Sequence, residues 1–280
     1  MSEKNEYSGR FIIEPGKKVR LAEIDPGYKH GHKNEADVTA LLEADKQRLH
    51  ELQTLLYAEH ARSLLICLQG MDTSGKDGTI SHIFGAMNPQ GVRVVSFKTP
   101  SAKEASHDFL WRVHEGTPAK GEIAVFNRSH YEDVLVVRVH ELVPKSVWSN
   151  RYEQINAFEQ ELSAEGTHIL KFFLHISKAA QLERFKARLD EPAKRWKISE
   201  ADYAERKHWD GYIDAYDEAI SRCSTKHAPW FVIPADHKWF RNLAIGRIMV
   251  EQLEALGMHY PKPTVDLDRI RREYHDAAKH

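Results

Sequence analysis

Residues 70–76 combine the side chains and glycines that bind phosphate groups. An apolar run, residues 64–68, precedes them, and four residues separate Gly70 from Gly75 and Lys76. In a G-x-x-x-x-G-K sequence the glycines permit tight turns, backbone N–H groups surround phosphate oxygens and the lysine neutralises their charge. A strand-to-helix turn that merely contains glycines is the alternative. The spacing predicts a phosphate-binding loop between a strand and a helix.

Carboxylates inside this loop raise a question of charge. The residue after the lysine is ordinarily a Ser or Thr that ligates Mg²⁺, but here it is Asp77, and Asp72 lies within the loop itself. Bare carboxylates would repel a phosphate chain, whereas a divalent cation held between them would attract it. The two extra charges therefore favour a metal-assisted phosphate site.

A second group of polar residues follows the predicted strand 122–126. Enzymes with this type of loop normally have a magnesium-holding Asp at the end of the neighbouring strand, and here Asn127 occupies that place, with Glu132 and Asp133 shortly after it. A solvated helix face is the alternative explanation for Glu132 and Asp133. The sequence predicts that carboxylates of both segments build the magnesium site: Asp72, Asp77, Glu132 and Asp133.

The third group is a cluster of cations in residues 184–197, interrupted by Pro192. A helix, a proline break and a second long helix suit a movable lid that closes over a phosphate chain and excludes water. A solvated helix surface is the alternative. The cluster consists of Arg184, Lys186, Arg188, Lys194, Arg195 and Lys197, and Lys98 and Lys103 extend the basic lining.

Strand and helix patterns alternate along the chain, as in a parallel sheet with helices on both faces. The predicted strands are 64–69, 93–97, 122–126, 168–176 and 230–234. The predicted helices are 35–59, 76–85, 102–114, 144–164, 179–189, 199–222 (opened by a Ser199–Asp202 capping box) and 237–256. We predict an α/β fold: a P-loop kinase-like three-layer α/β/α domain at 35–258 with a five-stranded parallel sheet and a helical lid at about 184–210, after an N-terminal arm at 1–34 and before a C-terminal tail at 259–280.

Composition narrows the class of protein. The 280 residues are 41% apolar and 29% charged, and 40 Lys+Arg against 41 Asp+Glu give a net charge of −1, which argues against nonspecific nucleic-acid binding. Two cysteines, no zinc spacing and no apolar leader or long apolar segment predict a cytoplasmic protein without membrane insertion. The 17 histidines include no H-E-x-x-H motif, and neither a G-x-S-x-G elbow nor a Cys/His nucleophile arrangement occurs.

Six phrases of the sequence together resemble the polyphosphate kinase 2 family over about residues 35–256. They are GMDTSGKDG, SHDFLWRVHEG, FNRSHYEDVLVVRVHELVP, KFFLHIS, RLDEPAKRWK and APWFVIPADHKWFRN. The resemblance implies a P-loop kinase fold related to thymidylate kinase. It also implies that Mg²⁺, with Mn²⁺ as a substitute, assists phosphoryl transfer between inorganic polyphosphate and an adenine nucleotide.

Position by position, the resemblance implies roles for individual residues. Asp72 and Glu132 would hold the metal, and the catalytic set would be Asp72, Lys76, Arg128, Glu132 and Asp133. The phosphate- and nucleotide-binding set would be Gly70, Thr73, Ser74, Gly75, Lys76, Asp77, Gly78, Asn127 and Arg128. The lid residues Arg188, Lys194 and Lys197 would meet polyphosphate or the phosphates of the nucleotide, and Trp196 would pack the lid. From the pattern of charges alone, Lys98, Lys103 and Arg184 are added to the polyphosphate-binding set.

One departure indicates a subgroup. Many members of the family have Asp where this chain has Asn127, and the combination with Glu132 resembles the third subgroup, whose members accept both AMP and ADP. We predict direct in-line transfer without a covalent intermediate, reversible in principle, because the attacking phosphate oxygen is already ionised. The resemblance implies a homo-oligomer, either dimer or tetramer. GDP and GMP remain open as acceptors. The alternatives are an ATP-dependent nucleoside or nucleotide kinase and a non-catalytic polyanion-binding scaffold.

Overall fold

A six-stranded sheet forms the centre of the computed structural model, which describes residues 6–278. The strand order is β1-β6-β5-β2-β4-β3; all neighbouring strands are parallel except β1, which is antiparallel to β6. The strands are β1 (Ile12–Ile13), β2 (Ser63–Gln69), β3 (Val92–Ser96), β4 (Ile123–Asn127), β5 (Thr167–His175) and β6 (Trp230–Pro234). This arrangement brings the carboxyl ends of β2 and β4 side by side, where the predicted site residues lie.

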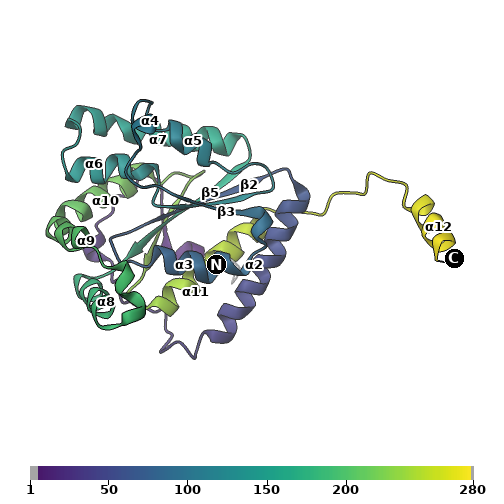
Figure 1. The fold of residues 1–280 in the computed structure, drawn as a ribbon, viewed down its shortest axis with the longest axis horizontal. Helices are drawn as coiled ribbons and strands as arrows, with labels where there is room; N and C mark the ends of the chain where they lie inside the picture. Colours follow the sequence, from purple (N-terminus) through teal and green to yellow (C-terminus); the bar gives the residue numbers. More distant parts are fainter. Residues whose placement is uncertain (1–5, 279–280) are drawn as a thin grey trace.

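Helices cover both faces of the sheet (Figure 1). Helices α2, α3 and α11 lie on one side, and α4 to α7 lie on the other. The α-helices are α1 (Glu6–Phe11), α2 (Thr39–Glu59), α3 (Lys76–Ile83), α4 (Ala102–Ala105), α5 (Trp111–Gly116), α6 (Val136–Val139), α7 (Lys145–Ala164), α8 (Lys178–Asp190), α9 (Glu200–Glu205), α10 (Trp209–Cys223), α11 (Lys238–Ala255) and α12 (Leu267–Ala277). The 3₁₀ helices are η2 (Leu21–Glu23), η3 (Phe84–Ala86), η4 (Pro89–Gly91), η5 (His130–Val134), η6 (Pro192–Lys197) and η7 (Arg206–His208). The predicted three-layer α/β/α fold is confirmed.

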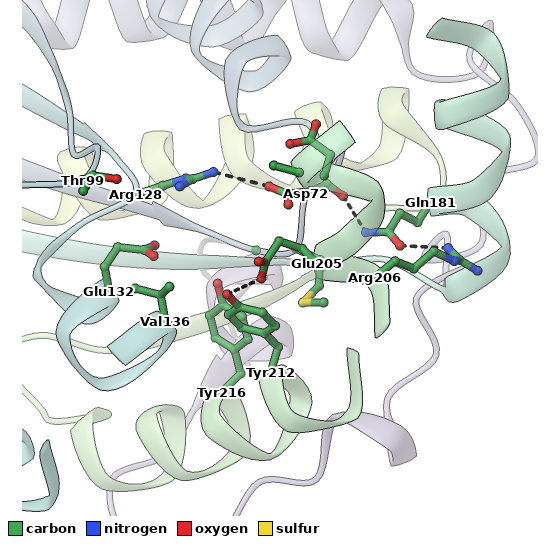
Figure 2. A pocket seen from close by; sticks show the side chains of 14 residues that line it. Asp72, Thr99, Arg128, Glu132, Val136, Gln181, Glu205, Arg206, Tyr212 and Tyr216 are labelled. Carbon is green, nitrogen blue, oxygen red and sulfur yellow. Dashed lines mark hydrogen bonds and ion pairs between the residues drawn. The ribbon is translucent and has the colours of Figure 1, made fainter. Parts of the chain in front are cut away.

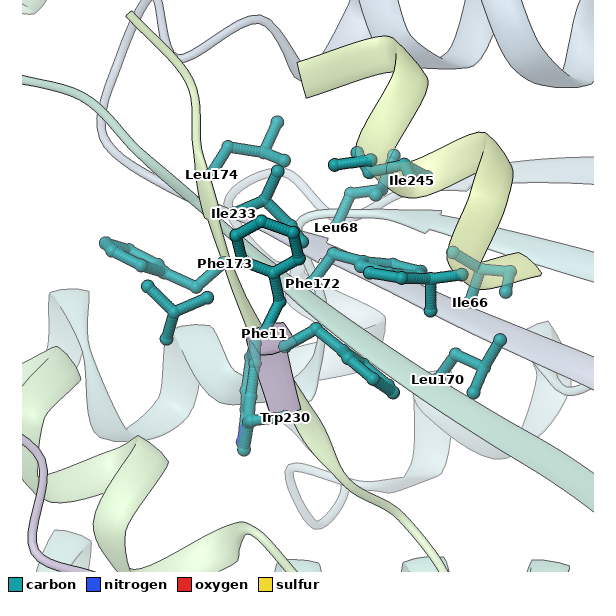
Figure 3. Close-up of a cluster of buried hydrophobic side chains, with 14 of the residues drawn as sticks. Phe11, Ile66, Leu68, Leu170, Phe172, Phe173, Leu174, Trp230, Ile233 and Ile245 are labelled. Carbon is teal, nitrogen blue, oxygen red and sulfur yellow. The ribbon is translucent and has the colours of Figure 1, made fainter. Parts of the chain in front are cut away.

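The central strands are apolar because both of their faces are covered. Every residue of β2 is buried; on β5, Phe172 faces α11 near Ile245, whereas Phe173 points to the opposite face and packs against Tyr216 of α10 (Figure 3). Parallel strands covered on both faces read as continuous apolar runs rather than as alternating patterns. This explains why the strand positions can be predicted from the sequence.

One charged pair lies inside this core. The Lys171 ammonium donates to the Glu159 carboxylate at 2.5 Å, to the Tyr131 hydroxyl at 2.8 Å and to the Cys223 carbonyl at 2.6 Å. Both charged side chains are fully buried, and Glu159 also contacts His130 at 3.1 Å. A buried charge costs several kcal/mol unless it is paired in this way. The pair therefore ties β5 and α7 to η5, the segment that carries Glu132.

The N-terminal arm adds a strand that the sequence analysis did not predict. Ile12 and Ile13 pair with β6, and two backbone N–H groups further along donate to α10: Val19 to the Ser221 hydroxyl and Leu21 to the Asp217 carboxylate, both at 2.8 Å. The prediction of five parallel strands is thus corrected to six strands, five of them parallel. Residues 1–5 of the predicted arm lie outside the described residues.

Two predicted helices are interrupted. The predicted helix 102–114 is two short helices, α4 and α5, and the predicted helix 199–222 consists of α9, η7 and α10. The predicted capping box is wrong, because the Ser199 side chain makes no cap bond and Asp202 instead binds Arg188 at 2.9 Å. The five predicted strands agree with the structure to within one residue at each end. Within residues 6–278, none of the helices combines the length and apolar character needed to cross a bilayer.

Candidate active site

The loop between β2 and α3 has the geometry of a phosphate cradle. Its backbone turns through positive φ at Gly70 (151°), Thr73 (64°) and Gly75 (104°) before α3 begins at Lys76. The Lys76 ammonium lies across the loop and donates to the carbonyls of Gly70, at 2.7 Å, and Met71, at 3.4 Å. Burial lowers the pKa of Lys76, and the Asp72 charge opposes that change. The loop therefore holds one cation beside the backbone N–H groups at the start of a helix, a combination that binds phosphate.

Two arginines from outside the loop hold its carbonyl groups. Arg184 on α8 donates to the carbonyls of Thr73, at 2.8 Å, and Ser74, at 3.0 Å, and also to the Ala235 and Asp236 carbonyls. Arg241 on α11 donates to the Ser74 carbonyl at 3.3 Å. Burial beside Arg184 lowers the pKa of Arg241 to about 9. Because the arginines bind the loop through its carbonyl groups, they do not occupy the N–H groups that would bind a phosphate.

A cavity of about 310 Å³ lies next to the loop (Figure 2). It joins Asp72 of the loop, Arg128 at the end of β4 and Glu132 of η5, and the Arg128 guanidinium contacts the Asp72 carboxylate at 3.4 Å. The lining residues are Gly70, Met71, Asp72, Thr99, Arg128, Glu132, Val136, Gln181, Ala201, Asp202, Glu205, Arg206, Tyr212 and Tyr216. The structure thus brings together the predicted residues from two distant segments of the chain.

Glu132 and Asp133 point to different places. Glu132 lines the cavity, where burial raises the pKa of its carboxyl group and the nearby Arg128 and Lys76 charges lower it. Asp133 instead accepts from Arg151 of α7 at 2.9 Å and does not line the cavity. The predicted placement of Asp133 at the catalytic centre is therefore not what the structure shows; it joins η5 to α7.

Asp77 and Asn127 form a pair at the rim of the loop. The Asn127 amide donates to the Asp77 carboxylate at 2.7 Å. Neither residue lines the cavity, although each lies next to a residue that belongs to the site.

The residues present suit a hard divalent cation. Among residues 6–278, no three His, Cys, Asp or Glu side chains form a ready-made metal cluster. Mg²⁺ is commonly held by one or two carboxylates together with substrate phosphates and water, and Asp72 and Glu132 offer two carboxylates to one cavity. Asp72 and Glu132 therefore form a pair of oxygen donors that fits the Mg²⁺ ion predicted from the sequence.

The predicted lid is the segment of α8, η6 and α9, and its cations differ in their surroundings. Arg188 is held by the Asp202 carboxylate at 2.9 Å and the Lys197 carbonyl at 3.0 Å, whereas Lys194 pairs with Glu191 on the surface. Trp196 is 78% exposed, so the prediction that it packs the lid is wrong. Lys197 is exposed and lies over the Trp196 ring at 5.0 Å.

The remaining predicted lid and basic residues lie farther from the cavity. Arg184 holds the loop from behind, as described above. Lys98 borders a neighbouring groove of about 330 Å³, and Lys103 lies over the Trp111 ring at 5.1 Å. Neither Lys98 nor Lys103 lines the main cavity.

Several cavity residues were missed by the sequence analysis. Gln181 donates to the Asp72 carbonyl at 3.1 Å and accepts from Arg206 at 2.8 Å, which links the lid to the loop. Tyr212 donates to Glu205 at 2.9 Å and forms one wall of the cavity (Figure 2). The i, i+4 spacing of Tyr212 and Tyr216 on a helix was the one local signal available for them.

Comparison with known proteins agrees with this geometry. The family profile described as Polyphosphate kinase 2 matches residues 32–260. An AMP/ADP-polyphosphate phosphotransferase of Meiothermus ruber is 48% identical over 265 residues, which cover 93% of this chain and 98% of the relative. An ADP-polyphosphate phosphotransferase of Rhodopseudomonas palustris is 46% identical over 274 residues, 91% of this chain and 92% of the relative.

A solved structure has the same fold over nearly the whole chain. The crystal structure of polyphosphate kinase 2 from Arthrobacter aurescens aligns with a TM-score of 0.94 at 42% identity and covers 99% of both chains. The phosphate loop, the facing carboxylates and these matches agree with the motifs found in the sequence. The chain belongs to the polyphosphate kinase 2 family.

Proposed function

We propose that this protein transfers the terminal phosphoryl group of inorganic polyphosphate to AMP and ADP, giving ADP and ATP. The observation that carries the proposal is the cavity that Asp72, Arg128 and Glu132 share beside the Lys76 loop. The names of the relatives support the same substrates, and the comparisons do not favour an ATP-dependent nucleotide kinase.

The residues of the chain supply positioning and charge. An oxygen of the acceptor's terminal phosphate is already ionised at neutral pH, so it attacks the end of the polyphosphate in line without a strong base. Lys76 and the loop N–H groups neutralise the phosphoryl group in transfer, and Arg128 balances charge on the acceptor side. Asp72 and Glu132 would hold a divalent cation, which would supply positive charge to neutralise the phosphate oxygens.

The choice of acceptor depends on Asn127 and Glu132. Asn127 adds no negative charge at the end of β4, and Glu132 places a carboxylate deeper in the cavity. We infer that this arrangement lets the site engage an acceptor with one phosphate fewer, so AMP and ADP are both used. Adenine preference rests on the relatives, and GDP and GMP stay open.

The organisation of the chain is part of the proposal. We assign residues 35–258 to the kinase domain, with its lid at about 184–210, residues 1–34 to an arm and residues 259–280 to a tail. We also propose Mg²⁺ as the metal, with Mn²⁺ able to replace it, a cytoplasmic location and a homo-oligomer of two or four chains.

The test is an end-point assay with Mg²⁺ and long-chain polyphosphate, given AMP or ADP separately, with products separated by anion exchange. We expect ADP and ATP from AMP, and loss of both products in Lys76→Ala. The control Lys120→Ala removes an exposed lysine that does not line the cavity, so its turnover should be normal. Glu132→Ala should reduce AMP use more than ADP use. Product from ADP alone would sink the proposed roles of Asn127 and Glu132. Turnover only with ATP as donor would establish the alternative kinase.

A further inference from the structure

A buried amide lies at the end of the strand that leads into the phosphate loop. Gln69 is the last residue of β2, and its side chain is fully buried. Its Nε2 donates to the Ser129 hydroxyl at 3.1 Å, and its Oε1 accepts from the Tyr216 hydroxyl at 3.2 Å. A leucine would fill this volume without needing partners, whereas a buried amide is costly unless both ends are bonded. The polar side chain therefore connects specific groups rather than only filling space.

The first connection leads to the acceptor side of the cavity. Ser129 immediately precedes η5 as its N-cap, and its buried hydroxyl accepts from the Tyr131 N–H at 3.2 Å. The residues on either side of this turn are Arg128, held at a φ of 61°, and Glu132. Glu132 is the third residue of η5 and lines the cavity together with Arg128. Gln69 thus bonds to the residue that precedes η5, the segment that carries Glu132.

The second connection leads to the loop and the lid. Tyr216 is buried on α10, lines the cavity together with Gly70, and has its ring 4.4 Å from that of Phe173. Gly70 is the first residue of the phosphate loop, and α10 follows the lid helix α9 through η7. One amide therefore joins three separate parts of the site: the loop, η5 and the helix that follows the lid.

We infer that Gln69 is a positioning residue for phosphoryl transfer, which together with Tyr216 fixes Arg128 and Glu132 relative to the phosphate loop. The inference rests on the proposed function, because it concerns the alignment of donor and acceptor in that reaction. In-line transfer is sensitive to such alignment, and a shift of about 1 Å costs on the order of 100-fold in rate. Gln69 itself does not line the cavity, so its effect passes through its partners.

The experiment compares steady-state kinetics of Gln69→Leu, Tyr216→Phe and Gln69→Glu with the wild type. Gln69→Leu should lower kcat by about 10- to 100-fold while the KM values for nucleotide and polyphosphate change by less than about 3-fold. Tyr216→Phe removes one hydroxyl and keeps the ring, so it should fold and lower kcat in the same direction by a smaller factor. Gln69→Glu keeps the length of the side chain but replaces the donor to Ser129 by a buried carboxylate, so it should lower kcat at least as much as Gln69→Leu does.

The matched control is Gln53→Leu. Gln53 is also a fully buried glutamine, but it lies on α2 and accepts from the Asn88 N–H at 3.2 Å, away from the cavity. Its replacement should lower the melting temperature with kcat unchanged. Wild-type kcat in both Gln69→Leu and Tyr216→Phe, or an equal loss in Gln53→Leu, would overturn the positioning role. A wild type that is inactive with polyphosphate would overturn the proposed function instead.

Discussion

The amide of Asn127 donates to the carboxylate of Asp77 at 2.7 Å. Phosphate-loop enzymes usually have a Ser or Thr directly after the lysine, where this chain has Asp77. They usually have an Asp at the end of the neighbouring strand, where this chain has Asn127. The two departures compensate each other, because an amide and a carboxylate at this distance attract whereas two carboxylates would repel. Asp77 is therefore held by the protein itself, and Asp72 and Glu132 are left to face the cavity.

Replacing Asn127 should reveal this pairing. Asn127→Asp would put two carboxylates in contact, so we expect a loss of about 1 kcal/mol in the free energy of unfolding in EDTA, with recovery in Mg²⁺. Urea denaturation at pH 7.5 with and without metal measures it. The control is the exchanged double variant Asp77→Asn/Asn127→Asp, which restores one amide and one carboxylate. Equal destabilisation of the single and double variants would contradict the pairing.

Gly75 should tolerate no side chain. Its φ is +104°, and a Cβ there would lie 1.8 Å from the Arg241 guanidinium. We expect Gly75→Ala to lower turnover by about 100-fold or more, because the loop must move away from its phosphate-binding shape. Gly78→Ala is the matched control, since its Cβ would meet Arg241 at 3.4 Å from an ordinary helical backbone. Thermal melts and turnover measure both, and equal activity of the two variants would refute the role of Arg241.

Arg184 and Lys197 belong to the same predicted lid, but removing Arg184 should lower stability, whereas removing Lys197 should weaken the binding of polyphosphate. Arg184 donates to four carbonyls, so Arg184→Ala should cost about 2–3 kcal/mol in the free energy of unfolding. Lys197 is exposed, so Lys197→Ala should change stability by less than about 0.5 kcal/mol and instead raise the KM for polyphosphate. Denaturation and polyphosphate titrations at two salt concentrations distinguish them. An unchanged stability in Arg184→Ala would show that it is a free lid cation after all.

Asp45 should make stability depend on pH far from the active site. Burial raises the pKa of this carboxyl to about 6, although Arg247 pairs with it at 3.1 Å. Because the folded state then binds the proton more tightly than the unfolded state does, stability from this group is present below about pH 4 and falls as the pH rises to about 6. The free energy of unfolding should fall by roughly 3 kcal/mol over this range relative to Asp45→Asn.

Denaturant titrations at pH 4.5, 5.5 and 7 would measure the difference between the two proteins. Glu43→Gln serves as the control, since Glu43 is an exposed carboxylate on the same helix. A difference between wild type and Asp45→Asn that stays constant with pH would contradict the buried titration.

The strands and the loop could be predicted because their signals are local. A fully covered parallel strand such as β2 is a run of apolar residues, and the spacing of Gly70 and Lys76 is short-range information. The direction in which a side chain points could not be predicted in the same way. Glu132 and Asp133 are neighbours in a 3₁₀ helix, where successive side chains are about 120° apart, so only one of them can face the cavity. Nothing in the local sequence indicates which one.

The contacts of residues that reach the site from distant parts of the chain could not be predicted from sequence patterns. Arg241 reaches the loop from α11, and its guanidinium is used on the Ser74 carbonyl, yet a lone arginine in a helix has no distinguishing pattern. The same is true of the lid cations, since the pairing of Arg188 with Asp202 depends on how the segment bends at Pro192. Charge could be counted from the sequence, but the partner of each charge could not.

The short strand β1 has a consequence for the order of folding. Ile12 pairs with Phe231, so the first strand of the chain has a partner that is synthesised only when most of the domain is complete. Chains are made from the N-terminus, and contacts between distant residues form slowly because a large loop must close first. The arm therefore waits, unpaired, until β6 has joined the sheet, and its docking across β6 and α10 is a closing step in assembly of the native protein.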